Sequence, residues 1–180
     1  MIPDESILNE IWAMKLQCTE KYQTRTALRS PPHLTLLPPF HYNESEEKTL
    51  YEQLANSCNG ILPFRIQLNG YNTFPSKVLY VQPVFNPILS SLQKSVEETF
   101  YKEYQPFAQK IFHPHITIAF RDWDQALFEQ AAKAYSDKHY DALWKVCNVS
   151  VLKHNGKEWQ EIYQYRLPGP NKESDNALSR

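Results

Sequence analysis

Two short segments of the sequence repeat a pattern that could carry acid–base chemistry. Residues 32–36 are Pro-His-Leu-Thr-Leu and residues 114–118 are Pro-His-Ile-Thr-Ile, so His33 and His115 lie 82 positions apart. Side chains alternate between two faces in an extended segment, so each histidine shares a face with the threonine two residues later. Each segment would therefore present an imidazole beside a hydroxyl, while its aliphatic side chains point into the core.

A repeated histidine favours a shared site more strongly than a single one does. One such histidine would most simply be a half-buried strand residue with a satisfied hydrogen bond. If the two halves of the chain are related by duplication, the segments can lie side by side around a pseudo-twofold axis, so that His33, Thr35, His115 and Thr117 line one groove. Because the unperturbed pKa of histidine is about 6.5, one ring can accept a proton and the other donate one near neutral pH.

The rest of the sequence predicts the helices and strands that position these segments. Apolar residues recur at helical or alternating spacing, and capping residues or Asn-Gly pairs mark the ends. We expect helices over residues 4–22, 44–59, 86–104 and 123–139, and strands over residues 33–37, 64–69, 77–84, 113–120, 143–153 and 158–167. Asn155-Gly156 is typical of a hairpin between the last two strands. Helices interleaved with strand pairs predict an α+β fold with largely antiparallel sheets.

Length and charge restrict the organisation and the partners. A chain of 180 residues suits one domain, which we place over residues 1–167, with a flexible polar tail over residues 168–180. The 19 Lys and Arg residues nearly balance the 20 Asp and Glu residues, giving a net charge of −1. So weak a field disfavours tight binding to long duplex nucleic acid but allows a local basic pocket for one phosphate, so an anionic partner would be small. We expect a monomer.

The cysteines and the apolar runs suggest a compartment. Cys18, Cys58 and Cys147 are far apart and form no CxxC pair, so neither a disulfide framework nor a zinc–cysteine site is expected. The first residues lack a basic leader followed by an apolar stretch, and no apolar run approaches the roughly 18 residues of a membrane span. These features favour a cytoplasmic protein that does not bind membranes.

The two segments and their surroundings resemble a known family. Residues 31–40, Pro-Pro-His-Leu-Thr-Leu-Leu-Pro-Pro-Phe, and residues 112–120, Phe-His-Pro-His-Ile-Thr-Ile-Ala-Phe, are similar to the signature of the 2H phosphoesterase superfamily, which includes 2′-5′ RNA ligase-like proteins and cyclic nucleotide phosphodiesterases. The resemblance implies a bilobal, duplicated fold in which flanking helices and sheets surround a central cleft. The family usually begins with a strand before its first helix, whereas the helical pattern here begins at about residue 4, so either that strand is absent or the start is truncated, and one sheet edge would differ from that of the family.

The resemblance also implies a reaction. A neutral His33 or His115 would draw a proton from water as it attacks phosphorus, and the other histidine would protonate the departing ribose oxygen of a 2′,3′-cyclic phosphate or a 2′-5′ linkage. Thr35 and Thr117 would donate hydrogen bonds to non-bridging oxygens. No metal or other cofactor is expected. A near-symmetric pair leaves open which histidine is the acid.

Two alternatives use the same four residues. The protein could act on RNA 3′ ends, including 2′-5′ ligation, which predicts better activity on oligonucleotides than on mononucleotides. It could instead be a binding module that holds a phosphorylated ligand without turning it over, which predicts saturable binding and no product.

Two further residues are candidates for substrate binding. Counting in twos from His115 places Arg121 on the same face, where it could reach the phosphate if the strand continues that far; the alternative is a solvated arginine at the strand end. Tyr80 could stack on a base or donate to phosphate, although a half-buried strand tyrosine needs no ligand. His113 shares a face with His115, but too few other ligand residues accompany them to favour a metal site.

Overall fold

Three of the four α-helices in the described residues begin at a residue whose side chain caps the first turn. The computed structural model describes residues 1–104 and 111–169. Its α-helices and 3-10 turns are α1 (Glu5–Tyr22), η1 (Thr26–Arg29), η2 (Glu44–Glu46), α2 (Glu47–Ser57), α3 (Pro87–Tyr104) and α4 (Gln125–Ser136). The side chains of Asp4, Asn86 and Asp124 accept hydrogen bonds from backbone N–H groups in the first turns of α1, α3 and α4. All four predicted helices are therefore confirmed, within a few residues at their ends.

The strands form two antiparallel sheets. The strands are β1 (Phe64–Phe74), β2 (Val78–Pro83), β3 (Ile116–Phe120), β4 (Asp141–Val146), β5 (Asn148–His154) and β6 (Trp159–Arg166). One sheet has the order β3-β2-β1-β4 and the other pairs β5 with β6. The β5–β6 hairpin turns at Asn155-Gly156, as predicted, and Gly156 has the positive φ of 94° that this turn needs.

Two strand predictions are wrong. The strand expected over residues 143–153 is two strands, because the chain leaves the four-stranded sheet at Cys147 and enters the β5–β6 sheet. The strand expected over residues 33–37 is reduced to one isolated bridge at Leu34, since the N–H and C=O of Leu34 bond to Met1 and prolines close both ends of the segment. A hydrophobic pattern records which residues are buried, not which strand they pair with.

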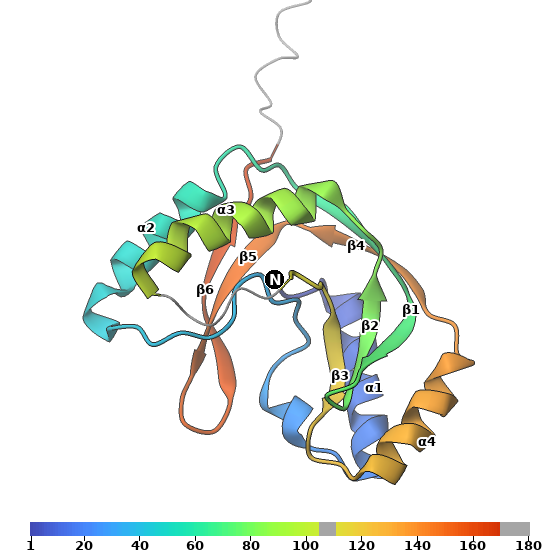
Figure 1. Ribbon diagram of the computed structural model, residues 1–180. Helices are drawn as coiled ribbons and strands as arrows, with labels where there is room; N and C mark the ends of the chain where they lie inside the picture. Colours follow the sequence, from blue (N-terminus) through green and yellow to red (C-terminus); the bar gives the residue numbers. More distant parts are fainter. Residues whose placement is uncertain (105–110, 170–180) are drawn as a thin grey trace, which may run out of the picture.

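The elements form two lobes. In Figure 1, α1 and α4 lie against the four-stranded sheet on one side, whereas α2 and α3 lie over β5 and β6 on the other. The chain crosses between the lobes where β4 continues into β5. This is the α+β, bilobal arrangement that the sequence predicts. Residues 170–180 of the expected tail lie outside the described residues.

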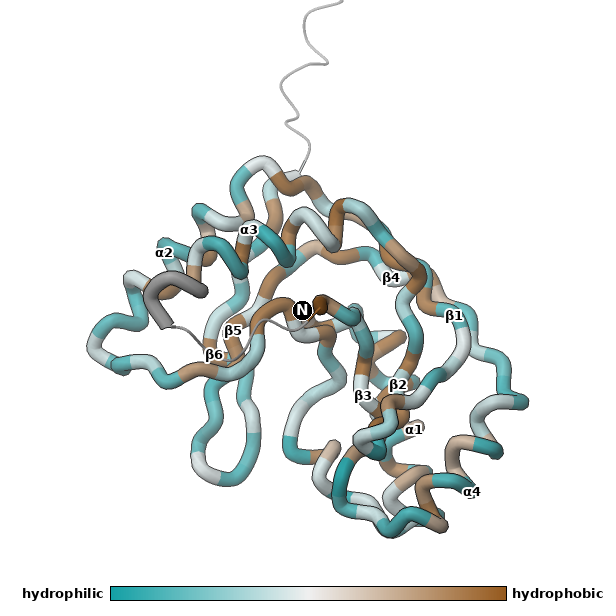
Figure 2. Tube along the Cα trace, in the orientation of Figure 1, coloured by the Kyte–Doolittle hydropathy of each residue, from teal (hydrophilic) through white to brown (hydrophobic). Residues whose placement is uncertain are grey.

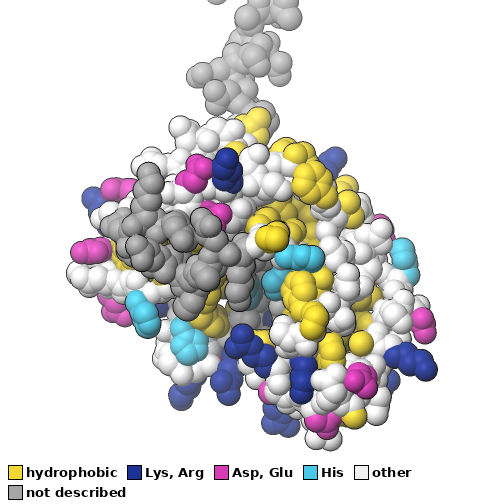
Figure 3. Space-filling view, in the orientation of Figure 1, with side chains coloured by type: hydrophobic (Ala, Val, Ile, Leu, Met, Phe, Trp, Pro, Cys, Tyr) yellow, Lys and Arg dark blue, Asp and Glu magenta, His cyan; other side chains and the backbone are white. Residues whose placement is uncertain are grey.

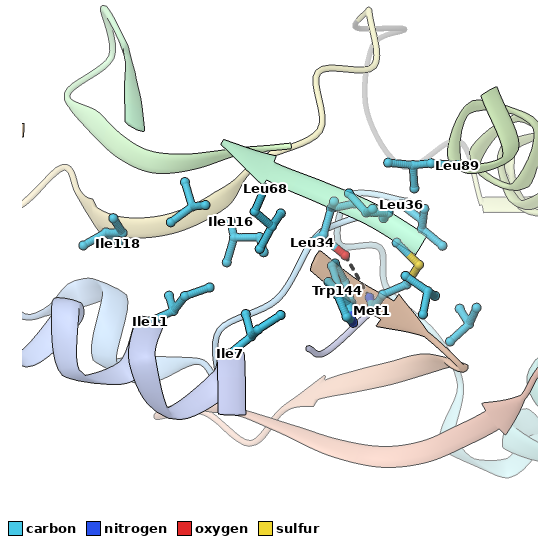
Figure 4. Close-up of a cluster of buried hydrophobic side chains, with 14 of the residues drawn as sticks. Met1, Ile7, Ile11, Leu34, Leu36, Leu68, Leu89, Ile116, Ile118 and Trp144 are labelled. Carbon is cyan, nitrogen blue, oxygen red and sulfur yellow. Dashed lines mark hydrogen bonds between the residues drawn. The ribbon is translucent and has the colours of Figure 1, made fainter. Parts of the chain in front are cut away.

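Hydrophobic residues from both histidine segments belong to the core. Figure 2 shows hydrophobic residues along β2, β3 and β5, and hydrophilic residues at the end of the β5–β6 hairpin. Leu34, Ile116 and Ile118 are completely buried, and Leu36 is 7% exposed. Figure 4 shows Leu34 and Ile116 in one cluster with Ile7 and Ile11 of α1. The aliphatic side chains of both histidine segments thus pack into the core and fix the position of these segments.

Two further features are the state of the cysteines and the apolar character of the helices. Cys18, Cys58 and Cys147 are all free thiols, the first two buried. Within the part of the chain that the structure describes, no helix combines the length and the apolar character that a membrane span requires.

Candidate active site

The structure brings the two repeated segments together. Leu34 and Ile116 form an antiparallel bridge, and they occupy equivalent positions in the two repeats, 82 residues apart. Antiparallel pairing of equivalent residues creates a local twofold axis between the segments, which sets His33 opposite Thr117 and Thr35 opposite His115. The four side chains predicted to act together therefore lie on one face, which we call the histidine face.

Burial alternates in the same way along both segments. Leu34, Leu36, Ile116 and Ile118 are buried, whereas the four residues of the histidine face are half-buried. This confirms the predicted alternation. Figure 3 shows histidine side chains in the middle of one side of the molecule, next to exposed hydrophobic side chains, with Lys and Arg side chains on the same side.

Both histidine rings are held by the same contact. The Nδ1 atom of His33 lies 2.7 Å from the carbonyl oxygen of Pro31, and the Nδ1 atom of His115 lies 2.8 Å from the carbonyl oxygen of His113. A carbonyl oxygen only accepts hydrogen bonds, so Nδ1 must be the protonated nitrogen in each ring. In the neutral ring, Nε2 then carries the lone pair. Among the described residues, neither Nε2 atom has a hydrogen-bond partner, so each is available to a ligand.

Burial favours the neutral form of both rings in the free protein. It lowers the pKa of His33 to about 4, an effect reinforced by the positive charges of the Met1 amino group, Lys15 and His115 and opposed by the hydrogen bond to Pro31. The charge of His115 is the smallest of these contributions, and it is consistent with the two rings lying on one face. Burial also lowers the pKa of His115, and the charge of His113 adds to this effect. A bound phosphate would raise the pKa of either ring and favour a proton on it.

The two threonines have hydroxyl groups without a hydrogen-bond partner among the described residues. Within residues 1–104 and 111–169, no hydrogen bond is formed by the side chain of Thr35 or Thr117. Each hydroxyl lies across the local twofold axis from a histidine and can donate one hydrogen bond. Nor does the described part of the chain contain a cluster of three or more His, Cys, Asp or Glu side chains able to hold a metal ion.

Comparison with known proteins identifies the family. The family model described as the 2′-5′ RNA ligase superfamily matches residues 3–158. The chain belongs to this superfamily. A Bacillus cytotoxicus protein, provisionally named a phosphoesterase, is 29% identical over 102 residues, and an Oceanobacillus iheyensis protein with the same provisional name is 30% identical over 121 residues. These matches cover 56% and 66% of this chain and 57% and 66% of the relatives, so the alignable part is somewhat more than half of the first relative's length.

Solved structures share the fold of this 2′-5′ RNA ligase superfamily member. A Thermus thermophilus structure (TT0787) superposes with a TM-score of 0.62 at 21% identity, covering 93% of this chain and 94% of that chain. Escherichia coli LigT in complex with 3′-AMP superposes with a TM-score of 0.53 at 17% identity, with the same coverage. At these identities the likeness concerns the fold.

Tyr80 occupies a different place from the one predicted. It is only 1% exposed, so its ring has no free face on which a base could stack. Its hydroxyl lies 3.2 Å from Nε2 of His113, and its ring packs edge-on against His115 with the centroids 5.4 Å apart. Tyr80 pairs with Thr117 across the strands, so it shares the histidine face. It is buried there beside His115 and supports His113, whose carbonyl holds His115.

The argument that placed Arg121 on the histidine face is wrong. Thr117 pairs with Tyr80 and Ala119 pairs with Leu79, which leaves Ile118 without a partner as a β-bulge. The bulge shifts the alternation, so Ala119 is completely buried instead of facing His115. The strand then ends at Phe120, and Arg121 follows with a left-handed φ of 69°. A phosphate contact by Arg121 remains a prediction, now without the support of strand geometry.

Sequence reasoning missed two residues that hold the segment before His33. Asp122 accepts hydrogen bonds from the Thr24 hydroxyl and from the N–H groups of Arg25 and Thr26, nearly one hundred positions away. Lys15 is buried and bonds to the same segment. No local signal identifies Asp122. Lys15 did carry a signal, because it continues the buried face of Ile7 and Ile11 at four-residue spacing.

Proposed function

We propose that this 2H phosphoesterase hydrolyses 2′,3′-cyclic phosphates or 2′-5′ linkages of small nucleotides without a metal. The observation that carries the proposal is the antiparallel bridge between Leu34 and Ile116, which sets His33 and His115 on one face. Both rings use Nδ1 to bind a backbone carbonyl, so both offer Nε2 to the same phosphate. Two such groups are what an attack on phosphorus with departure of a ribose oxygen needs.

In the proposed reaction, a neutral Nε2 takes a proton from water as the water oxygen forms a bond to phosphorus. The other ring, protonated at Nε2 in the complex, gives its proton to the ribose oxygen as the bond between that oxygen and phosphorus breaks. The Thr35 and Thr117 hydroxyls donate to the non-bridging oxygens, where negative charge accumulates. The product is a phosphate monoester, and the proton count balances across the two rings.

The surroundings of the two rings favour a division of roles. His33 has a pKa lowered to about 4 and a lysine nearby, so it favours the unprotonated form that a base requires. His115 lies beside the neutral Tyr80 ring and Phe74. We therefore assign His33 as the base and His115 as the acid for hydrolysis. In ligation, which the family description suggests as a second activity, a 5′-hydroxyl would replace water: it would form a bond to the phosphorus of a 2′,3′-cyclic phosphate, the bond to the 3′-oxygen would break, and the bond to the 2′-oxygen would remain.

The substrate class has support from a relative. Escherichia coli LigT, which shares the fold, forms a complex with 3′-AMP, a small nucleotide with a phosphate on the ribose. The proposed ligand of this chain has the same parts, a ribose and a phosphate ester. We further propose that residues 1–167 form one domain and that the protein is a monomer in the cytoplasm.

Product analysis tests the proposal. The purified protein is incubated in chelator with 2′,3′-cyclic nucleotides and 2′-5′ linked dinucleotides, beside His33→Ala, His115→Ala and, as a matched control, the exposed His139→Ala. We expect one phosphate regioisomer from the wild type and from the control, and almost none from the other two variants. Full activity in both active-site variants would contradict the mechanism. Saturable binding without product would instead support the binding module, and a strong preference for oligonucleotides would support action on RNA ends.

A further inference from the structure

Lys15 is a buried cation on the face of α1 that packs into the protein. It is 2% exposed, and its Nζ atom donates hydrogen bonds to the carbonyl oxygens of Ala27 and Ser30, each at 2.8 Å. It also lies over the Trp12 ring, 5.5 Å from the centroid. No ion pair to a carboxylate is formed by Lys15 within the described residues. Burying an ammonium group without a carboxylate is costly, so the two carbonyls must compensate for it.

The carbonyls that Lys15 binds belong to the segment that leads to His33. Ser30 gives its carbonyl to Lys15, and the next carbonyl in the chain, that of Pro31, accepts the hydrogen bond from Nδ1 of His33. Two consecutive carbonyls therefore connect helix α1 to the catalytic ring. Because this segment pairs with no strand before Leu34, side chains have to hold it. Asp122 fixes its beginning at residues 24–26, and Lys15 fixes its end.

The charge of Lys15 also acts on the ring. Its positive charge is among those that lower the pKa of His33, together with the Met1 amino group and His115. Burial lowers the pKa of Lys15 itself to about 7, so Lys15 is charged over the range in which His33 titrates. The cations that act on His115 do not include a lysine.

We propose that Lys15 is a positioning residue for His33: its ammonium group fixes the Ser30–Pro31 backbone, so that the Pro31 carbonyl holds the ring by Nδ1, and its charge opposes protonation of Nε2. This would keep His33 in the orientation and the charge state of a base. The consequence for catalysis rests on the proposed function, whereas the consequence for the ring itself does not.

Ring-nitrogen NMR and kinetics together test this role. Lys15→Met removes the donors and the charge, Lys15→Gln keeps a donor only, and Lys15→Arg keeps both. Lys21→Met is the matched control, because it removes the same charge from an exposed position of the same helix. For each protein, the pKa and the tautomer of His33 and His115 are measured by NMR, and kcat and KM are measured on a 2′,3′-cyclic nucleotide.

We expect Lys15→Met to raise the pKa of His33 by roughly half a pH unit or more and to leave that of His115 unchanged. We expect kcat to fall roughly 10- to 100-fold with little change in KM, as for a misplaced catalytic group. Lys15→Gln should raise the pKa of His33 with a smaller loss of kcat, and Lys15→Arg should restore most of both. The Lys21→Met control should resemble the wild type.

An unchanged His33 pKa and tautomer in Lys15→Met, or an equal change in Lys21→Met, would overturn the inference. If Lys15→Met does not fold, Lys15→Gln decides the effect of the charge by the same NMR measurement. If the wild type turns over no cyclic nucleotide, the proposed function fails while the NMR result still decides the role of Lys15. If the wild type is active but Lys15→Met changes neither the pKa nor the tautomer of His33, the inference about Lys15 fails while the proposed function stands.

Discussion

The segments that carry His33 and His115 have the same local geometry, but different residues surround them. Each ring is held through Nδ1 by the carbonyl two residues earlier, and each threonine lies across the bridge from the other histidine. His115, however, lies directly before the paired strand β3 and packs against the ring of Tyr80, whose hydroxyl contacts His113. His33 lies in a segment with a single bridge, and Lys15 holds the backbone before it.

This difference shows which parts of the site are symmetric. The proposed chemistry uses the two rings, the two hydroxyls and the bridge between Leu34 and Ile116, and these are shared by both halves. The supports are not shared, since one half uses a buried cation and the other a neutral tyrosine. Because a cation opposes protonation and a neutral tyrosine does not, different supports can give equivalent histidines different roles.

The largest expected effect concerns the symmetric part. His33→Ala and His115→Ala should each lower kcat/KM by roughly 10²–10⁴-fold, the range for loss of a general acid or base. Because the two rings act as a unit, the double variant should fall little further than the more damaged single variant. Kinetics on one 2′,3′-cyclic nucleotide check this. A double variant whose loss equals the product of the single losses would show that the rings act independently.

The threonines test whether the hydroxyls are equivalent. Thr35→Val and Thr117→Val remove a hydroxyl at almost constant volume, so each should lower kcat by about 10²–10³-fold, as for loss of a donor to an oxyanion. The two losses should agree within about tenfold if both hydroxyls bind the same phosphate. The measurement is steady-state kinetics with unfolding curves as a control. If one of the two variants kept the kcat of the wild type, only the other threonine would contact the phosphate.

Much of this arrangement could be predicted from the sequence. The helices and the alternation of burial in the two histidine segments depend on residues close together in the chain, and these predictions are confirmed. The division at Cys147, the bulge at Ile118 and the single bridge at Leu34 depend on which backbone groups pair across the sheets. Those pairings remove the strand argument that placed Arg121 on the histidine face, and they set Tyr80 opposite Thr117, where it is buried beside the histidines. Lys15 was recognisable, as a charge on an apolar helical face, but only the structure shows the carbonyls that it binds.

The pH dependence of the free energy of unfolding should report the lowered pKa of His33. The folded pKa of His33, about 4, is below its unfolded value, so the unfolded state binds the proton more tightly. Stability contributed by neutral His33 should therefore be present above pH 6.5 and be lost as the pH falls toward 4, by roughly 1–3 kcal/mol. Urea unfolding of wild type and His33→Asn at several pH values measures it. An equal pH dependence in both proteins would contradict the lowered pKa.

The smallest expected effect comes from the support of His115. Tyr80→Phe removes the hydrogen bond to His113 but keeps the ring that packs against His115. We expect a loss of stability of about 0.5–1.5 kcal/mol. We also expect only a severalfold decrease in kcat, because the carbonyl of His113 still accepts the hydrogen bond from His115. Urea unfolding and kinetics check these effects. A loss as large as that of His115→Ala would place the Tyr80 hydroxyl in the chemistry itself.

The central claim is that the two histidines bind one phosphate across the local twofold axis. Titration of the wild-type protein with 3′-AMP, followed by NMR at the ring nitrogens of His33 and His115, tests this most directly. We predict that the Nε2 resonances of both rings shift together along one saturation curve, while both Nδ1 atoms remain protonated. A shift at only one ring, or at neither ring despite saturable binding, would contradict the account.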